Sequence, residues 1–217
     1  MQKTRRLTLL LILLLLLSSL PAAPRAAAAE AGDRVVGYYA AWAARQGYTP
    51  DKLPAEQFTQ INYAFARIEN GRLALDDPEG DRKTLRELTA LRKRNPELKI
   101  VLSVGGWDES TWFSDVASSP AQRETFARSC LDLIREHGLD GVDLDWEYPV
   151  SGGAAGVIHR PQDRENFTRL LQASRKTLDS QSRRDGRDYV LSIAGAAGSG
   201  YLNCIEPRAG AESVDHV

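Results

Sequence analysis

Short apolar runs alternate with longer, helix-like segments along most of this chain. The apolar runs predict five strands, at residues 34–40, 60–66, 99–104, 141–147 and 189–194. Runs with almost no polar side chain, such as Ile100-Val101-Leu102, are typical of strands that are covered on both faces. Strands that alternate with helices indicate βα units arranged around a parallel sheet.

Three of the intervening segments have helical spacing. The predicted helices are the segment that ends at residues 95–96, the segment 119–138 and the segment 164–182. The middle helix has the clearest ends, because Ser119 can cap its first turn and Gly138 suits its C-terminal exit.

Three acidic side chains lie on one face of the predicted strand at residues 141–147. Alternate residues of a strand point the same way, so Asp143, Asp145 and Glu147 share a face and apolar residues occupy the other. Successive positions on one face are roughly 6.5 Å apart, so like charges there raise at least one pKa and favour sharing of a proton. This arrangement adds no stability, and it indicates acid–base chemistry.

Two other interpretations of these acids are weaker. A solvated edge strand is disfavoured by the apolar opposite face and by Gly141 ahead of the acids. A calcium site is disfavoured because no turn-rich loop brings oxygen ligands from several directions. We therefore predict no metal and no organic cofactor. Asp140 has the opposite parity from the three acids and is expected to support the start of the strand.

Five βα units are compatible with a doubly wound sheet or with the start of a barrel. The line of acids favours the barrel, since a barrel strand has one face toward the lumen and one toward the helices. Catalytic groups of such barrels lie at the C-terminal ends of strands, and Glu147 ends the acidic strand. We predict an α/β fold, a (β/α)8 TIM barrel, of which about the first five βα units are present.

The first 29 residues, 1–29, have the pattern of a secretory signal peptide. A basic start that includes Arg5 and Arg6 precedes an apolar run at residues 7–20, and alanines at 26–29 offer a cleavage site. The apolar run of 14 residues is short for a membrane span, which needs about 20, so an uncleaved anchor is the weaker alternative. We expect a secreted protein, extracellular or periplasmic, with its domain at residues 30–217.

Charge and cysteine content narrow the class of protein further. After cleavage the chain would carry 24 basic and 29 acidic side chains, which disfavours a nucleic-acid partner. No later segment is predicted to cross a membrane. Two cysteines are too few for a disulfide framework, and Cys130 lies on the apolar stripe of a predicted helix, so we expect a buried free thiol there.

Two motifs resemble those of a known family. The sequence Asp-Gly-Val-Asp-Leu-Asp-Trp-Glu at residues 140–147 resembles the Asp-x-x-Asp-x-Asp-x-Glu signature of family 18 glycoside hydrolases, the chitinases. The sequence Ser-Val-Gly-Gly at residues 103–106 resembles the Ser-x-Gly-Gly motif that these enzymes carry on strand three. The resemblance extends over residues 34–217.

The resemblance implies a secreted chitinase that acts on chitin or chito-oligosaccharides by a retaining, substrate-assisted mechanism. Glu147 would be the general acid and later the base, and a carboxyl group beside two others is expected to have the raised pKa that this role needs. The carbonyl oxygen of the substrate's own acetamido group would attack the anomeric carbon. Asp145 would orient that group, and Asp143 would share a proton with Asp145.

The resemblance also implies residues that contact the substrate or support the aspartates: Tyr38, Ser103, Gly105, Gly106, Trp107 and Tyr148. Tyr38 and Ser103 would donate hydroxyl groups beneath the aspartates, although Ser103 could instead bond the backbone. The two glycines would permit a turn close to the sugar. Trp107 would line the product side, and Tyr148 would touch the substrate beside the acid.

Two other functions share these motifs. A sugar-binding lectin can use the same barrel, but such relatives lack the proton donor that Glu147 would supply. An endo-β-N-acetylglucosaminidase that acts on N-glycans shares the signature.

The family also takes a Tyr from strand six and a Trp from strand eight, and such barrels have about 250 residues. We therefore expect a part of a longer enzyme that is poorly active and poorly stable alone. The predicted strand at residues 189–194 would then be an exposed edge of the sheet.

Overall fold

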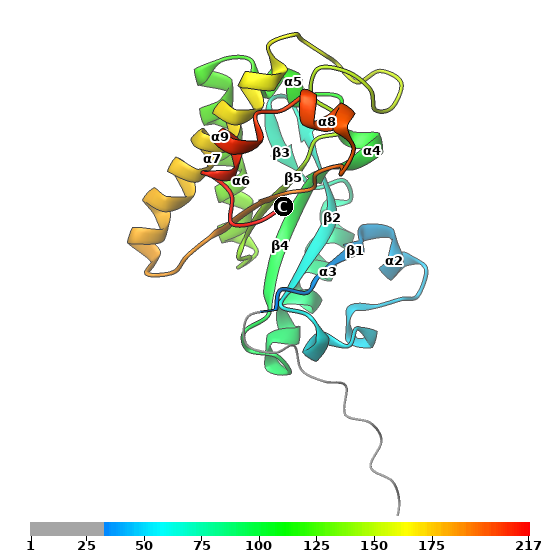
Figure 1. The fold of residues 1–217 in the computed structure, drawn as a ribbon. Coiled ribbons are helices and arrows are strands. Elements are labelled where there is room, and N and C mark those ends of the chain that lie inside the picture. Colours follow the sequence, from blue (N-terminus) through cyan, green and yellow to red (C-terminus); the bar gives the residue numbers. More distant parts are fainter. Residues whose placement is uncertain (1–32) are drawn as a thin grey trace, which may run out of the picture.

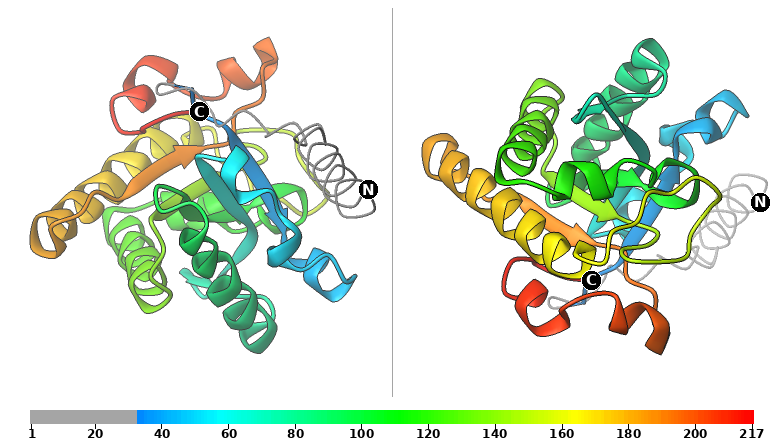
Figure 2. Two further views of the ribbon diagram at one scale, coloured as in Figure 1. Left: turned by 90° about the horizontal axis from the view of Figure 1, so that it is seen from below. Right: turned by 90° about the horizontal axis from the view of Figure 1, so that it is seen from above.

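The computed structural model describes residues 33–217, so the predicted signal peptide lies outside the described residues. A curved sheet forms the centre, with the long helices on its outer side (Figures 1 and 2). The strands are β1 (Val36–Ala40), β2 (Gln60–Glu69), β3 (Arg72–Ala74), β4 (Lys99–Gly105), β5 (Gly141–Asp145) and β6 (Val190–Ile193). Five of them are parallel neighbours in the order β1-β2-β4-β5-β6, as in the first units of a (β/α)8 barrel, and the fold prediction is confirmed.

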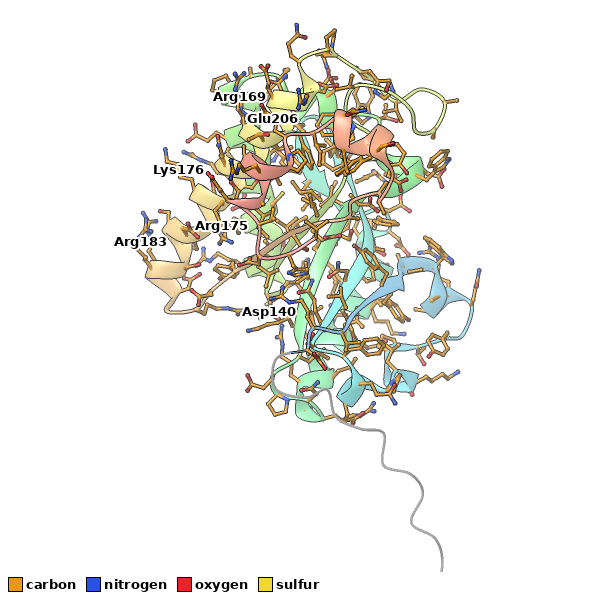
Figure 3. All side chains as sticks on the ribbon, viewed as in Figure 1. Asp140, Arg169, Arg175, Lys176, Arg183 and Glu206 are labelled. Atoms are coloured by element: carbon orange, nitrogen blue, oxygen red, sulfur yellow. The ribbon has the colours of Figure 1, made fainter. Side chains whose placement is uncertain are left out.

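Helices α3, α6 and α7 form the outer layer, and they occupy the three segments with predicted helical spacing. The α-helices are α2 (Ala41–Arg45), α3 (Pro78–Ala90), α4 (Gly106–Glu109), α5 (Phe113–Ala117), α6 (Pro120–Glu136), α7 (Asp163–Asp185), α8 (Ser199–Asn203) and α9 (Pro207–Ala211). Short 3-10 turns are η1 (Pro50–Lys52), η2 (Ala55–Gln57) and η3 (Leu91–Lys93). The outer face of α7 is polar, and Figure 3 shows Arg169, Lys176 and Arg183 pointing away from the sheet.

The ends of α6 follow the predicted signals. The hydroxyl group of Ser119 accepts a hydrogen bond from the Gln122 backbone N–H at 3.3 Å, which satisfies one free donor of the first turn. At the other end Gly138 has a φ of 62°, the left-handed conformation that ends many helices.

The strand β3 was missed, and the acidic strand was predicted two residues too long. β2 continues past the predicted boundary and returns through Asn70-Gly71 into β3, an antiparallel hairpin. Both turn residues have positive φ, so Asn-Gly, a frequent hairpin turn, was the overlooked signal. β5 ends at Asp145, two residues before the predicted end, and Glu147 therefore lies in the following loop.

The face of β5 opposite the acids is buried against the outer helices. Val142 and Leu144 are fully buried, and Trp146 is 1% exposed. The Trp146 ring stacks on Phe113 with centroids 5.4 Å apart, and the edge of Phe167 meets it at the same distance. This packing fixes which way the acidic face points. Cys130 is a buried free thiol in the same core, as predicted.

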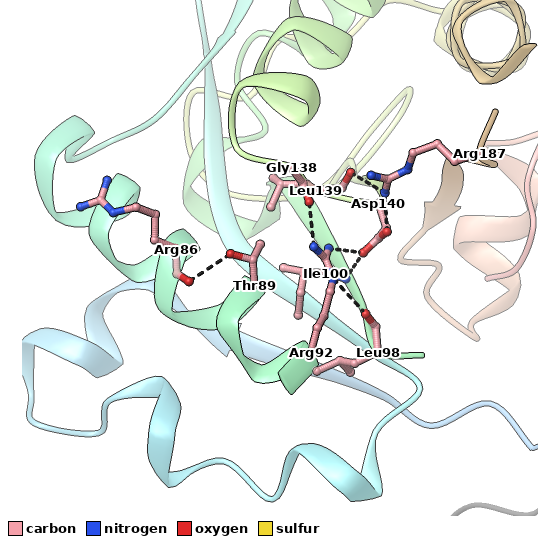
Figure 4. A network of polar contacts seen from close by, with 9 residues as sticks. All are labelled: Arg86, Thr89, Arg92, Leu98, Ile100, Gly138, Leu139, Asp140 and Arg187. Carbon is pink, nitrogen blue, oxygen red and sulfur yellow. Dashed lines mark hydrogen bonds and ion pairs between the residues drawn. The ribbon is translucent and has the colours of Figure 1, made fainter. Parts of the chain in front are cut away.

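Asp140 anchors the N-terminal end of β5. Its carboxylate forms ion pairs with Arg92 and Arg187 and accepts the Ile100 backbone N–H at 2.8 Å (Figure 4). The carboxylate therefore joins β5 to β4 and to the segment that precedes β6. The expectation that Asp140 supports the start of the strand is confirmed.

The outer edge of β6, which we expected to be exposed, is partly occupied. The Asp215 backbone N–H donates to the Leu191 carbonyl at 2.8 Å, and the Leu191 N–H donates to the Asp215 carboxylate at 2.8 Å. His216 then pairs with Ser192 in a parallel bridge. None of the helices within residues 33–217 combines the length and apolar character of a membrane span.

Candidate active site

Asp143 is buried at the centre of the lumen face, where three hydroxyl groups surround it. The register places Ser103, Asp143 and Ser192 side by side on β4, β5 and β6. Asp143 is 1% exposed and accepts hydrogen bonds from Tyr38 Oη at 2.9 Å, Ser103 Oγ at 2.7 Å and Ser192 Oγ at 2.6 Å. Hydrogen bonds to a carboxylate stabilise its charged form.

Among the residues that the structure describes, the carboxylate of Asp143 has no cationic partner. Within residues 33–217 none of the ion pairs includes it. Burial and the charge of Asp143 raise the pKa of Tyr38, so the phenol keeps its proton and acts as a donor. Neutral groups alone therefore hold this buried acid.

Asp145 lies one step higher on the same face and is only partly buried. Burial, followed by the charges of Glu147 and Asp143, raises the pKa of Asp145 to about 7. This group therefore keeps a proton well above the pH at which a free aspartic acid loses it. The raised pKa that we expected among these neighbouring carboxyl groups is found at Asp145.

Glu147 lies beyond the last strand residue, in a loop that bends across the top of the sheet. Its backbone N–H donates to Ser110 Oγ at 2.9 Å. The adjacent Tyr148 packs edge-on against Tyr201, with ring centroids 5.8 Å apart. A hydrogen bond to Glu147, together with burial, raises the pKa of Tyr148, so its ring carries a neutral hydroxyl group beside the acid.

A cleft of about 470 Å³ opens at the C-terminal ends of the parallel strands. It is lined by Tyr38, Ala40, Trp42, Ala64, Phe65, Asp145, Glu147, Tyr148, Ala194, Gly195 and Ala196. Its volume lies in the range of small-molecule sites, and its walls combine aromatic faces with two carboxyl groups. The cleft thus brings Glu147 and Asp145 together, with Asp143 beneath them.

The glycines of the Ser-Val-Gly-Gly segment lie against protein atoms rather than in the lining of the cleft. Gly105 has a φ of 99°, and a Cβ atom there would lie 2.4 Å from the Asp145 carbonyl oxygen. Gly106 has a φ of 75°, and a Cβ atom there would lie 2.8 Å from the Phe65 ring. Both positions therefore require glycine so that the end of β4 can approach Asp145 and Phe65 closely.

The exposed tryptophans are not gathered at one place. Trp42 is half-exposed and lines the cleft. Trp107 is half-exposed as well, on α4, but it is not among the residues that line the cleft. Trp112 lines a separate pocket beside the Asn70-Gly71 turn. Of these three rings, Trp42 is the one that lines the cleft beside the acids, where a sugar ring could stack on it.

Sequence reasoning missed three groups at this site. Ser192 is the third donor to Asp143, Ser110 bonds the Glu147 backbone, and Phe65 forms a wall of the cleft. A polar Ser192 inside an otherwise apolar strand was a usable signal. Ser110 lies in a loop, and its contact depends on tertiary structure alone. In the part of the chain that the structure describes, no cluster of His, Cys, Asp and Glu has the grouping of a metal site.

Comparison with known proteins identifies the family. Residues 34–217 match the family model described as "Glycosyl hydrolases family 18". The chain belongs to this family. It is 39% identical over 223 residues to Chitinase A1 of Niallia circulans, a match that covers 81% of this chain and 32% of that protein. The chain therefore spans about a third of that relative's length.

Solved family 18 structures share the fold. Chitinase ChiA74 from Bacillus thuringiensis matches with a TM-score of 0.81 and 30% identity, over 85% of this chain and 38% of that one. A family 18 N-acetylglucosaminidase from Paenibacillus barengoltzii matches with a TM-score of 0.73 and 37% identity, over 84% of this chain and 52% of that one.

The three carboxyl groups of this family 18 chain differ in their surroundings. Asp143 is buried among hydroxyl groups, Asp145 keeps a proton near neutral pH, and Glu147 faces the cleft. Such a gradient from buried to exposed can hold a proton and deliver it to a ligand in the cleft.

Proposed function

We propose that this chain carries the acid–base machinery of a secreted chitinase, which hydrolyses β-1,4 links between N-acetylglucosamine units with retention of configuration. The observation that carries the proposal is one cleft lined by both Glu147 and Asp145, above a buried Asp143. A general acid needs access to the substrate, and the group beneath it needs to be protected from water. These three residues meet both needs.

In the first step Glu147 donates its proton to the glycosidic oxygen, and the bond from that oxygen to the anomeric carbon breaks. The substrate's acetamido carbonyl oxygen attacks the anomeric carbon from the other face and forms an oxazolinium ion. Asp145 accepts the acetamido N–H and stabilises the positive charge of the ring. Its raised pKa, about 7, is consistent with a group that gains stability when a positive charge develops next to it.

Asp143 adjusts the charge of Asp145 during this step. In the free enzyme a proton is shared between the two aspartates, and it moves to Asp143 when Asp145 turns to the acetamido group. The hydroxyl groups of Tyr38, Ser103 and Ser192 support Asp143 in both states, because a hydroxyl group can donate or accept after rotation.

In the second step Glu147, now a carboxylate, takes a proton from water. The oxygen of that water attacks the anomeric carbon and opens the oxazolinium ring. Two inversions at the same carbon leave the configuration retained. Glu147 ends the cycle protonated.

The substrate class is proposed from the family relatives, several of which are chitinases. An N-acetylglucosaminidase with similar structure keeps open the length of the substrate and the end from which it is cleaved. An endo-β-N-acetylglucosaminidase that acts on N-glycans would use the same acids. A lectin is disfavoured, because the chain has a glutamate, Glu147, at the position proposed for the proton donor. Secretion is proposed from the signal-peptide pattern at residues 1–29.

The test is Glu147→Gln in the complete natural protein, assayed on chito-oligosaccharides. We expect kcat to fall by at least about 10³-fold while oligosaccharide binding persists, because the amide keeps the shape but has no proton to give. Glu136→Gln, at the surface end of α6, is the matched control and should leave kcat unchanged. Equal turnover by the Glu147 variant and the control would overturn the proposal.

A further inference from the structure

Ser110 is a fully buried side chain that joins two loops at the edge of the candidate active site. It follows α4, in the connection between β4 and α5, and has no exposed surface. Its Oγ lies 2.9 Å from the Glu147 backbone nitrogen, 2.8 Å from the Gly106 carbonyl oxygen and 3.1 Å from the Asp145 carbonyl oxygen. One hydroxyl group therefore touches the backbone on both sides of Trp146.

The chemistry of a hydroxyl group assigns each of these contacts. The Glu147 N–H is a donor, so Ser110 accepts there. The single hydroxyl hydrogen of Ser110 then points to the Gly106 or the Asp145 carbonyl oxygen. The result is a bridge from the turn after β4 to the backbone that carries Asp145 and Glu147.

This bridge holds the backbone beyond the end of β5, where hydrogen bonds between strands no longer do so. β5 ends at Asp145. On the side of β6, the last hydrogen bond to this strand is donated by the Ala194 N–H to the Leu144 carbonyl oxygen at 3.2 Å. Glu147 lies beyond this ladder, so its direction is not set by strand pairing. The Glu147 backbone N–H donates to Ser110 in a partly buried position, and an N–H that loses its partner away from water is costly.

We infer that Ser110 is a positioning residue for Glu147, setting the direction from which that carboxyl group enters the cleft. The inference rests on the proposed role of Glu147 as general acid. A general acid must lie within hydrogen-bond reach of the oxygen that it protonates, and small displacements cost a large part of the rate. Ser110 does not line the cleft, so substrate binding does not depend on it.

The chain offers a matched control in Ser129 on α6. Ser129 is 2% exposed, accepts the Leu73 backbone N–H at 2.8 Å and donates to the Phe126 carbonyl oxygen at 2.7 Å. It thus makes the same two kinds of bond as Ser110. Its bonds join α6 to β3, far from the acids in the sheet order.

The experiment compares Ser110→Ala, Ser110→Thr and Ser129→Ala in the complete natural protein. We expect the two alanine variants to lower the melting temperature by similar amounts. Only Ser110→Ala should lower kcat, by about 10- to 100-fold with KM nearly unchanged. Ser110→Thr keeps the hydroxyl group and should recover most of that loss.

Hydrogen–deuterium exchange of the peptide that contains Glu147 gives a second readout that needs no turnover. Exchange at this segment should speed up in Ser110→Ala and stay at the wild-type rate in Ser129→Ala. Unchanged exchange and a kcat equal to that of Ser129→Ala would overturn the inference. If the wild-type protein cleaves no N-acetylglucosamine oligomer, the proposed function fails, and the exchange result still decides whether Ser110 holds this segment.

Discussion

Two buried aspartates at β5, three residues apart, are held in opposite ways. Asp140, at the N-terminal end, is 5% exposed and is neutralised by the guanidinium groups of Arg92 and Arg187. Asp143, in the middle of the strand, is 1% exposed and is held by three hydroxyl groups, with no cation from residues 33–217. Figure 4 shows the charged network around the first.

The difference separates a structural acid from one that can change its charge. An aspartate between two arginines keeps a fixed charge, because losing that charge would leave buried cations without a partner. Hydroxyl groups carry no charge and rotate, so they can stabilise a carboxylate or a protonated carboxyl group in the same place. Burial with neutral partners is therefore the feature that marks Asp143 for chemistry.

Among changes to these two aspartates, the largest effect on turnover is expected for Asp143→Asn. Turnover should fall by about 10²- to 10³-fold, because the amide cannot exchange a proton with Asp145. The free energy of unfolding should change by less than about 1 kcal/mol, since no cation loses its partner. Steady-state kinetics and chemical denaturation measure both quantities. A large loss of stability with normal turnover would show that Asp143, like Asp140, is a structural acid.

The raised pKa of Asp145 should make the stability of the protein depend on pH. Its native pKa of about 7 lies above the value of 3.8 for the unfolded chain, so the native state binds more protons between these pH values. This contribution to stability is present below about pH 4 and is lost as the pH rises to 7. Each pKa unit corresponds to about 1.4 kcal/mol, which sets an upper limit of about 4 kcal/mol.

Asp145→Asn removes this titration. The stability of the variant relative to the wild type should therefore increase from pH 4 to pH 8, as measured by thermal unfolding across that range. A constant difference between the two proteins would show that Asp145 titrates normally in the folded state.

Much of this contrast follows from local sequence. The acids at 143, 145 and 147 share a face because side chains alternate in a strand, and the motif around them marks Ser103 and Tyr38. Ser192 and Ser110 could not be placed, because their contacts depend on the β5–β6 register and on a loop crossing the sheet. The arginines of Asp140 come from distant segments, and no short-range pattern joins them.

Asp140→Asn should have the reverse effect of the change at Asp143. It leaves two partly buried guanidinium groups without their carboxylate, and the expected cost is about 3 kcal/mol of unfolding free energy. The kcat of the folded fraction should stay at the wild-type value. Active-site titration at a temperature well below the melting point measures that fraction. A fall in kcat with unchanged stability would contradict a purely structural role for Asp140.

The smallest effect is expected for Ser192→Ala, which removes one of the three hydroxyl groups on Asp143. A hydrogen bond to a charged group contributes about 1.5 to 3 kcal/mol. Two hydroxyl groups remain on Asp143 in this variant, so we expect the lower end of that range, which corresponds to a fall in turnover of roughly 10-fold. Ser174→Ala, a buried serine on α7 without a hydrogen-bond partner in the described residues, is the control and should leave turnover unchanged. Equal turnover of the two variants would show that Ser192 does not support Asp143.

The anomeric configuration of the first product is the most direct test of the proposed mechanism. The complete natural protein is mixed with a chito-oligosaccharide, and the new reducing end is followed by proton NMR before the anomers equilibrate. The substrate-assisted mechanism predicts that the β-anomer appears first, because attack by the substrate's acetamido oxygen and then by water retains configuration. Initial release of the α-anomer would contradict the proposed roles of Asp143, Asp145 and Glu147.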